Sequence, residues 1–569
     1  MIPVKNTPTR IQRERETRKK RARKEGLSIQ PKNARGSAET ESPQTDSQKT
    51  QSGSETMPSV GAVFEVMGSS RRQYEVTLRH LDSRANHCTC PDFATNSLST
   101  CKHLEGVKLF LEEEAPELYE TMKESARESE FPPADLVYLD HSKSPPVVRY
   151  HLDDETLEKK KACEELFGKK NRLSLTKMRR GFKGFLKKAP SLGINIAPEV
   201  VTFVDRSLRE VDLDKAAKKE AERFRKGLET APAKAESAEP PSEDGPEDSV
   251  LPYIAEGAEF LIKTRRALLT DATGLDRAAQ AIIASKHLLT RESSDRNKLF
   301  VFCPEAHLMR WRELIAEHLV STPMVFKAPV SHDERAKLAK ARFILSAYKD
   351  VPFIGASLRI HEEDILILDD VHRVRNWQGS GGQAIKTIQS AYVFALSSPR
   401  ILRDPRGLFY TVQYLDSYLL GPAWSFFDEH LVRDSRGAIL EAQNMDQALE
   451  KIQECTLGRT LEEVKDQIET RLHLEYGVLP TVAQNKKIHP LLYSFIQKVS
   501  IGREWSPVDR AEVVAQLARL RKLSNYLEEG VSGQASPKVK ALLSLLEDLR
   551  EENGPLSFVV FTRFRDVAS

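Results

Sequence analysis

The second half of the chain alternates short apolar runs with helical stretches, and this alternation constrains the fold more than any other feature. The runs are four to six residues long and are typical of strands buried on both faces. They are Arg266–Thr270, Lys298–Cys303, Phe343–Ala347, Ile365–Leu368 and Val393–Leu396. Helical patterns such as Ala278–Leu289 and Leu308–Leu319 separate them. The alternation predicts an α/β fold, with a parallel sheet covered by helices on both faces and a ligand site at the carboxyl ends of its strands.

Length and composition limit the remaining choices. A chain of 569 residues exceeds one hydrophobic core, so we expect about two to four domains. The net charge of +3 conceals strong local imbalance and identifies no partner by itself. No apolar run approaches the roughly 18 residues of a membrane span, and the N-terminus lacks the apolar core of a signal peptide. We therefore expect a soluble intracellular protein without membrane contact, cytoplasmic and nucleoid-associated in a bacterium or nuclear in a eukaryote.

The N-terminal part of the chain contains two basic segments with open interpretations. Residues 9–24 are a dense basic run that could contact nucleic acid, act as a targeting signal or remain a solvated tail. In residues 158–188, many lysines and arginines surround Phe167, Phe182 and Phe185. That mixture could bind a phosphate backbone and stack on bases, which predicts salt-sensitive DNA or RNA binding. The alternative is a helical connector with a solvated basic face.

Three of the six cysteines lie close together in the sequence beside a histidine. Cys88 and Cys90 are separated by one residue, and after ten more residues Cys101 and His103 follow with the same spacing. Thiolates and imidazole suit Zn²⁺, and four protein ligands leave no position for a reactive water. The pattern predicts a structural zinc site that supplies much of the folding free energy of a small module. The alternative is a chance grouping of thiols.

The surroundings of these four residues resemble a SWIM-type zinc finger. Alternating residues at 63–67 and 74–78 predict a β-hairpin before the cysteines, Pro91-Asp-Phe follows Cys90, and a helical pattern follows His103. The resemblance covers about residues 60–115. It implies a role in binding DNA or protein.

Residues 269–278 resemble a phosphate-binding loop in which the functional residues have been replaced by others. Such a loop needs a glycine, a lysine and a hydroxyl in succession. Asp276, Arg277 and Ala278 stand at these three positions. Asp276 adds negative charge where an anion would lie, Arg277 keeps a positive charge with a different geometry, and Ala278 has no oxygen for Mg²⁺.

From residue 251 onward the chain resembles the ATPase core of Swi/Snf-type remodelling motors, which belong to helicase superfamily two. The motifs occur in the family's order. They are Leu251-Pro-Tyr-Ile-Ala-Glu-Gly, Asp271-Ala-Thr-Gly-Leu-Asp-Arg-Ala, Phe302-Cys-Pro-Glu-Ala-His-Leu-Met-Arg-Trp-Arg, Ile344-Leu-Ser-Ala-Tyr, Leu366-Ile-Leu-Asp-Asp-Val-His and Phe394-Ala-Leu-Ser-Ser-Pro-Arg. The resemblance implies a RecA-like lobe, ATP with Mg²⁺ as cofactors, and nucleic acid as partner, with DNA favoured over RNA.

The resemblance also assigns roles to individual residues. It implies nucleotide binding by a set of loop residues and catalysis by the Asp-Glu-x-His box. The loop residues are Asp271, Gly274, Leu275 and Arg277, and the box residues are Asp369, Asp370 and His372. Asp370 is one methylene shorter than the expected glutamate, and Ile254 replaces the glutamine that reads adenine. A misplacement of about 1 Å can cost roughly 10²-fold in rate, so these exchanges together predict impaired hydrolysis.

The last residues resemble the start of a second motor lobe, at Ser536-Pro-Lys-Val-Lys and Ser557-Phe-Val-Val-Phe. In such motors that lobe carries an arginine finger and a DNA-gripping face. Two functions therefore remain open on the sequence. One is a nucleic-acid- or protein-binding module with impaired ATP hydrolysis. The other is an ATP-dependent DNA translocase completed by a second chain that carries the rest of the lobe.

The expected division of the chain follows from these features. It comprises a disordered basic and polar tail (1–58), a zinc finger (59–115), a helical basic connector (116–230), a linker (231–249), a RecA-like lobe (250–430), a helical insertion (431–535) and the beginning of a second lobe (536–569).

Overall fold

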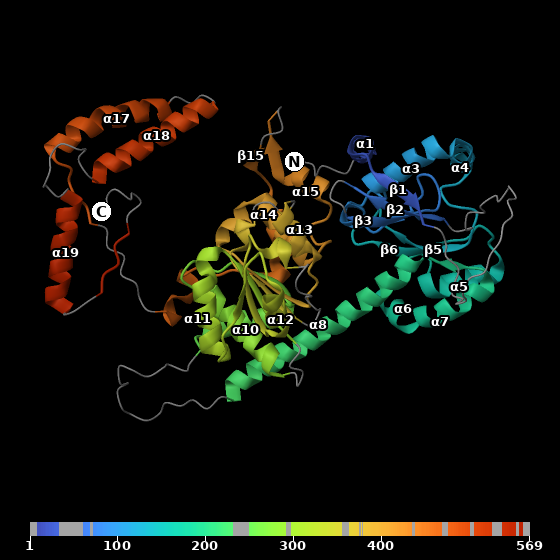
Figure 1. Ribbon diagram of the computed structural model, residues 1–569, viewed down its shortest axis with the longest axis horizontal. Coiled ribbons are helices and arrows are strands. Elements are labelled where there is room, and N and C mark those ends of the chain that lie inside the picture. Colours follow the sequence, from blue (N-terminus) through green and yellow to red (C-terminus); the bar gives the residue numbers. More distant parts are fainter. Residues whose placement is uncertain are drawn as a thin grey trace. The chain divides into compact units, whose positions relative to one another are not determined.

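The structure is a computed structural model (Figure 1). It describes residues 8–32, 61–68, 72–230, 250–291, 297–354, 364–374, 377, 379–434, 439–468, 476–500, 506–525, 537–553 and 557–561. The chain divides into two compact units, Met1–Ile468 and Glu469–Ser569. The expected linker at 231–249 lies outside the described residues.

The first unit begins with a small module around the cysteine cluster. Its antiparallel sheet has the order β1-β2-β3-β4, and helices pack on it. The strands are β1 (Ser28–Pro31), β2 (Ala62–Met67), β3 (Gln73–Leu78) and β4 (His87–Cys88), and the helices are α1 (Pro8–Glu25), α2 (Pro91–Thr95), α3 (Lys102–Glu114) and α4 (Pro116–Glu128). The predicted hairpin and following helix are confirmed as β2, β3 and α3.

The prediction of a disordered tail over residues 1–58 is wrong for residues 8–32. These residues form α1 and β1, and β1 pairs with β2 in antiparallel register. Composition argued for disorder because the segment has few large apolar residues. The segment is instead ordered by contacts with the module, since Ala22 is buried and Arg18 is 7% exposed.

A second small sheet follows, so the connector at 116–230 is not purely helical as predicted. Its strand order is β6-β5-β7. Its strands are β5 (Leu136–Asp140), β6 (Val147–His151) and β7 (Asn195–Ile196), and its helices are α5 (Leu157–Phe167), α6 (Leu175–Arg180), α7 (Phe182–Lys188) and α8 (Pro198–Thr230). Phe167, Phe182 and Phe185 are buried in the core of this module. The predicted stacking of these rings on bases is therefore wrong, although the lysines and arginines around them remain largely exposed.

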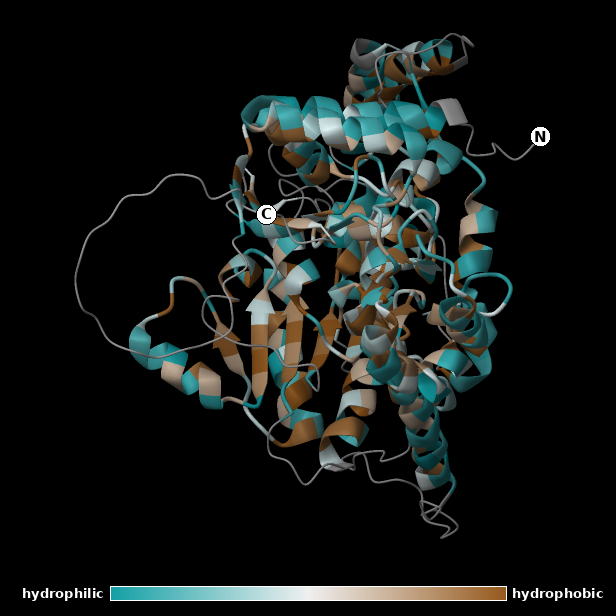
Figure 2. Cartoon of the chain, turned by 90° about the vertical axis from the view of Figure 1, so that its right-hand side faces the viewer, coloured by the Kyte–Doolittle hydropathy of each residue, from teal (hydrophilic) through white to brown (hydrophobic). Residues whose placement is uncertain are grey.

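The largest element is a parallel sheet of seven strands, in the order β10-β11-β9-β12-β13-β8-β16. The strands are β8 (Arg266–Leu269), β9 (Leu299–Cys303), β10 (Met324–Phe326), β11 (Phe343–Ala347), β12 (Ile365–Leu368), β13 (Tyr392–Leu396) and β16 (Thr456–Leu457). All five predicted strands are present, within a residue of their expected bounds. The short strands β10 and β16 were not predicted, because runs of two or three residues carry no periodic signal. The strands are mainly hydrophobic along their length, as Figure 2 shows.

Helices cover both faces of this sheet, as predicted. Two buried clusters, one on each face, hold the layers together. On one face pack α9 (Pro252–Thr264), α10 (Arg277–Arg291), α11 (Leu308–Leu319) and the end of α8. On the other pack α12 (His332–Lys340), α13 (Ser380–Thr387), α14 (Pro405–Leu415), α15 (Ala423–His430) and α16 (Met445–Ile452).

The first part of the predicted helical insertion belongs to the α/β lobe. Within residues 431–468 lie the hairpin β14 (Leu431–Arg433) and β15 (Ile439–Ala442), helix α16 and strand β16. Strand β16 pairs in parallel with β8 at the edge of the large sheet. The lobe therefore extends beyond the expected boundary at residue 430.

The second unit contains α17 (Val482–Ser500), α18 (Pro507–Asn525) and α19 (Pro537–Asn553). Helices α17 and α18 pack on each other. The described residues 557–561 form no strand. Among the helices that the structure describes in the two units, none has the length and apolar composition needed to cross a membrane.

Candidate metal centre and phosphate-loop pocket

The four predicted metal ligands come together from three short elements. Cys88 ends β4, Cys90 caps the N-terminus of α2, Cys101 caps the N-terminus of α3, and His103 lies in the first turn of α3. The thiol sulfurs of Cys90 and Cys101 accept hydrogen bonds from the Phe93 and Leu104 amides, at 3.4 and 3.5 Å. Both cysteines therefore set the start of a helix as well as facing the cluster.

The ligand atoms of the four residues all lie within 4.8 Å of one another, and all four residues are buried. The Sγ of Cys88 lies 3.9 Å from Nδ1 of His103. In a tetrahedral zinc site with Zn–S bonds of about 2.3 Å, ligand atoms lie roughly 3.8 Å apart. The donor set and its spacing therefore fit a divalent metal of the zinc type.

The electrostatics of this cluster are those of thiols packed against each other out of water. Burial raises the pKa of Cys88 and of Cys101. Hydrogen bonds from Cys101 and Cys88 lower the pKa of Cys90. Without a cation, the three cysteines can hold one thiolate, to which the neighbouring thiols donate hydrogen bonds. A metal ion stabilises all three cysteines as thiolates.

The exchanged phosphate loop runs from β8 to α10, at the carboxyl edge of the large sheet. Gly274 has φ +104°, and Asp276 has φ +27°, a conformation that strains a residue with a side chain. The Asp276 carboxylate accepts hydrogen bonds from the Ala279 amide at 3.2 Å and from Arg310 at 2.6 Å. The carboxylate that the loop presents at Asp276 is therefore already paired with donors of the protein itself.

Arg277 is turned toward its own loop. Its guanidinium donates to the backbone oxygen of Asp271 at 2.6 Å and lies 3.9 Å from the carboxylate of Asp370. The charge that replaces the phosphate-binding lysine is thus held between a carbonyl and a carboxylate.

Asp369 and Asp370 follow β12 on the same edge of the sheet. One oxygen of Asp369, Oδ2, lies 2.8 Å from Nδ1 of His307 and accepts a hydrogen bond from Trp311 Nε1 at 2.8 Å. The hydroxyl of Tyr348 donates to the Asp369 backbone oxygen at 2.7 Å. His307 and Trp311 belong to the predicted Cys-Pro…Trp-Arg motif, but the sequence did not identify them as partners of this acid.

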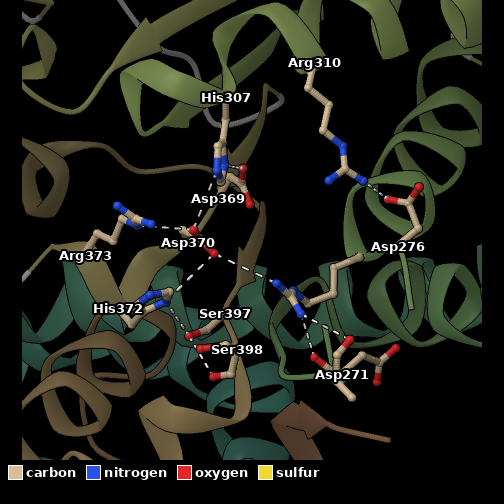
Figure 3. A network of polar contacts seen from close by, with 12 residues as sticks. Asp271, Asp276, His307, Arg310, Asp369, Asp370, His372, Arg373, Ser397 and Ser398 are labelled. Atoms are coloured by element: carbon tan, nitrogen blue, oxygen red, sulfur yellow. Dashed lines mark hydrogen bonds and ion pairs between the residues drawn. The ribbon is translucent and has the colours of Figure 1, made fainter. Parts of the chain in front are cut away.

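His372, the third residue of the predicted box, lies one turn further on. Its Nδ1 is 3.2 Å from the Ser397 hydroxyl, and Ser397 follows β13. Burial lowers the pKa of His372, which favours the neutral imidazole. The residue therefore connects the ends of β12 and β13, as Figure 3 shows.

Two predicted nucleotide-binding residues point away from the pocket. Leu275 is fully buried and packs beside Tyr253. Asp271 is fully buried and forms an ion pair with Arg459, whose Nη2 lies 2.7 Å from Oδ2. Arg459 also donates to Gln280 at 2.8 Å and to the Tyr253 carbonyl at 2.7 Å. Arg459 comes from the segment after β16, almost two hundred residues along the chain, and no sequence signal marked it.

A cavity of about 200 Å³ lies between the loop and the two acids. Its lining residues are Thr273, Gly274, Asp276, Arg277, Ala278, His307, Arg310, Asp369 and Asp370. Four of the predicted site residues line this cavity together, namely Gly274, Arg277, Asp369 and Asp370. The other three, Asp271, Leu275 and His372, are not among its lining residues.

A family model described as the SNF2-related domain matches residues 105–525, which is more than half of the chain. Two solved structures are similar to this chain, and both are of SWI2/SNF2 proteins from Sulfolobus solfataricus. The ATPase core in complex with double-stranded DNA is 18% identical, with a TM-score of 0.34, over 56% of this chain and 68% of that one. The ATPase core domain is 18% identical, with a TM-score of 0.32, over 59% of this chain and 69% of that one. No curated protein matches the chain.

Proposed function

This chain belongs to the SNF2-related domain family, and we propose on that premise that it is a nucleic-acid-binding member that does not hydrolyse ATP. Duplex DNA is the proposed partner. A protein partner is the alternative that the zinc-finger resemblance leaves open. The proposal also includes a structural zinc ion held by Cys88, Cys90, Cys101 and His103.

The mutual pairing of charges in the phosphate-loop pocket carries the proposal. Arg277 is bound to the Asp271 carbonyl and faces Asp370, while Arg310 is bound to Asp276. In a site that grips a triphosphate, cations are directed at the anion and the loop offers backbone N–H groups. Here the cations neutralise the acids of the protein itself.

The residues present do not fit Mg²⁺ with a triphosphate. Ala278 offers no oxygen, and Oδ2 of Asp369 already contacts His307 and Trp311. Asp276 would place a carboxylate against phosphate oxygens, and like charges at such distances repel strongly in a partly buried site. No hydrolytic step is therefore assigned to these residues.

A restored variant makes the test sharp. We would compare the natural protein with one that carries Asp276→Gly, Arg277→Lys, Ala278→Thr and Asp370→Glu. Fluorescent-nucleotide binding and DNA-stimulated phosphate release are measured for both, with Asp369→Ala in the natural and in the restored background as the matched controls. The proposal expects binding only in the restored variant. Hydrolysis by the natural protein that Asp369→Ala abolishes would overturn it.

The zinc component has its own support and test. Four buried ligand atoms lie within 4.8 Å of one another at the ends of β4, α2 and α3. We expect one zinc per chain by elemental analysis of purified protein. A Cys163→Ser variant, which removes a buried cysteine outside the cluster, should keep the metal, and Cys90→Ser should lose it. Equal zinc content in the two variants would refute the assignment.

The competing function is an ATP-dependent DNA translocase completed by a second chain. One observation favours it: Asp369, Asp370 and a positive charge at residue 277 still meet at the carboxyl edge of the sheet. The same ATPase measurement separates the two functions, because a translocase must show DNA-stimulated hydrolysis when the second lobe is supplied in trans.

A further inference from the structure

Helix α1 packs against the rest of the small module around the cysteine cluster, which comprises β1–β4 and α2–α4 and is called the metal module below. The opposite face of α1 carries a row of cations exposed to the solvent. We propose that this outer face of α1 is a binding surface for the phosphate backbone of duplex DNA, and that the metal module holds the helix in place for it. The inference rests on the proposed nucleic-acid-binding function and names the surface that carries it.

The inner face of α1 is fixed to the module by polar contacts. Arg18, with a side chain 8% exposed, lies 3.2 Å from Asp92 and 2.6 Å from Glu14. Arg15 donates to the Leu98 carbonyl at 3.0 Å, and Glu25 forms an ion pair with Lys102.

Close apolar packing continues directly after the helix. Leu27 lies over Gly106 of α3, where an added Cβ would come within 2.5 Å of a Leu27 methyl carbon. A side chain at residue 106 would therefore push the end of α1 away from the module. Ile29 lies beside it, with its terminal carbon 3.6 Å from the same Cβ position.

The anchoring residues of the module are neighbours of the four metal ligands. Asp92 lies in the first turn of α2, which Cys90 caps. Lys102 lies between Cys101 and His103, and Leu98 belongs to the loop that joins the two pairs of ligands. A metal ion that fixes Cys90, Cys101 and His103 also fixes the residues on which α1 rests.

The outer face of α1 carries exposed cations that have no ion pair among the residues the structure describes. They are Arg13, Lys20, Arg21, Arg23 and Lys24. Two of the helix's acids, Glu14 and Glu25, are occupied by Arg18 and Lys102, so Glu16 is the acid left on the exposed side. From Arg13 to Lys24 the row extends about 16 Å at about 1.5 Å per residue.

This composition fits nucleic acid better than other partners. Long cationic side chains in a row match the line of phosphates on duplex DNA, and their binding is sequence-independent and salt-sensitive. A membrane-binding helix would also expose large apolar side chains. Among the described residues of α1, no large hydrophobic side chain is exposed. An apolar protein partner is disfavoured for the same reason.

The test compares two triple variants with the same change in charge. One carries Lys20→Gln, Arg23→Gln and Lys24→Gln on α1. The control carries Lys215→Gln, Lys218→Gln and Lys219→Gln, which are exposed lysines of the long helix α8. Glutamine has nearly the helix propensity of lysine and arginine, so both helices should remain folded. Affinity for a short duplex is measured by fluorescence anisotropy over a series of salt concentrations, on full-length protein loaded with zinc.

If α1 contacts phosphates, the α1 variant should bind up to about 100-fold more weakly near 0.15 M salt. The slope of log affinity against log salt should fall by up to about 2.7, which is about 0.9 for each phosphate that the variant no longer neutralises. The α8 control should keep the natural slope. Removing zinc with a chelator should reduce the slope of the natural protein in the same way.

The outcomes separate the two proposals. If the natural protein does not bind the duplex, the proposed function fails. If it binds but the α1 and α8 variants bind equally well, the function stands and the assignment of α1 is wrong. An unchanged slope after zinc removal would overturn the role given to the metal module.

Discussion

Replacing Arg459 by methionine should destabilise the α/β lobe far more than removing a comparable arginine at its surface. Arg459 lies in the segment after β16 with a side chain 9% exposed, and its partner Asp271 is fully buried. Its guanidinium lies 3.2 Å from Oδ1 and 2.7 Å from Oδ2 of Asp271, and 2.8 Å from Oε1 of Gln280. Methionine preserves much of the volume but none of these hydrogen bonds.

The expected magnitude follows from what remains around Asp271. Breaking one side of a buried ion pair costs about 3 to 5 kcal/mol, because a charge is left without compensation. Asp271 would keep the Arg459 amide at 2.9 Å and the Gln280 amide group at 2.8 Å as donors. We therefore expect a loss near the lower limit, about 3 kcal/mol of the free energy of unfolding. Adding Asp271→Asn should recover at least about 1 kcal/mol, since the buried charge is then removed.

Equilibrium urea unfolding provides the measurement. Trp311 and Trp377 are buried in the lobe, so tryptophan fluorescence reports on its unfolding. The control is Arg310→Met, because Arg310 is 57% exposed and pairs with Asp276, which is 38% exposed. Exposed pairs contribute about 0.2 to 1 kcal/mol, so this variant should stay within about 1 kcal/mol of the natural protein. If both variants lost the same free energy of unfolding, the argument that the buried Arg459–Asp271 pair contributes more to stability than an exposed pair would be refuted.

Three further predictions concern other parts of the molecule. Chelation of zinc should lower the melting temperature of the natural protein and leave that of Cys90→Ser unchanged, as calorimetry can show. Burial lowers the pKa of His141 to about 4 from 6.5. The unfolded imidazole therefore binds a proton between those pH values while the folded one does not, and stability should fall by up to about 3 kcal/mol as pH drops from 7 to 4. His141→Phe should show a correspondingly flatter pH profile of urea unfolding, and parallel profiles would contradict this assignment. Phe182→Ala should cost about 3 to 5 kcal/mol of stability because the ring is buried, whereas Lys183→Gln should be neutral in the same assay.

Much of the fold could be predicted from local pattern. The five longer strands of the large sheet and helices such as α11 were predicted within one or two residues, because each is a continuous apolar run or a clear helical period. Strand β16 was missed, since two residues carry no period and its place is fixed by pairing with β8. Helix α1 was missed as well, because its composition is that of a disordered segment and its order comes from contacts with α3.

For the candidate sites as well, the sequence predicted the features that depend on residues close together along the chain. The spacing of Cys88, Cys90, Cys101 and His103 predicted a cluster, and the structure brings the four together. The exchanged residues at 276–278 were equally visible, because a motif is read from consecutive positions. Aromatic residues at 167, 182 and 185 gave the wrong prediction, since a sequence does not say which side chains a core encloses.

The amino-acid sequence by itself determined the family, the alternation of strand and helix, the cluster of three cysteines and a histidine, and the altered loop. All of these depend on residues close together along the chain or on motifs in a fixed order. Only the tertiary structure decided that Arg459 neutralises Asp271 and that His307 and Trp311 contact the Asp369 carboxylate. It also decided that a basic segment becomes an ordered helix beside the cysteine–histidine cluster. The physical reason is that charge and burial act through space, between residues that the chain holds far apart.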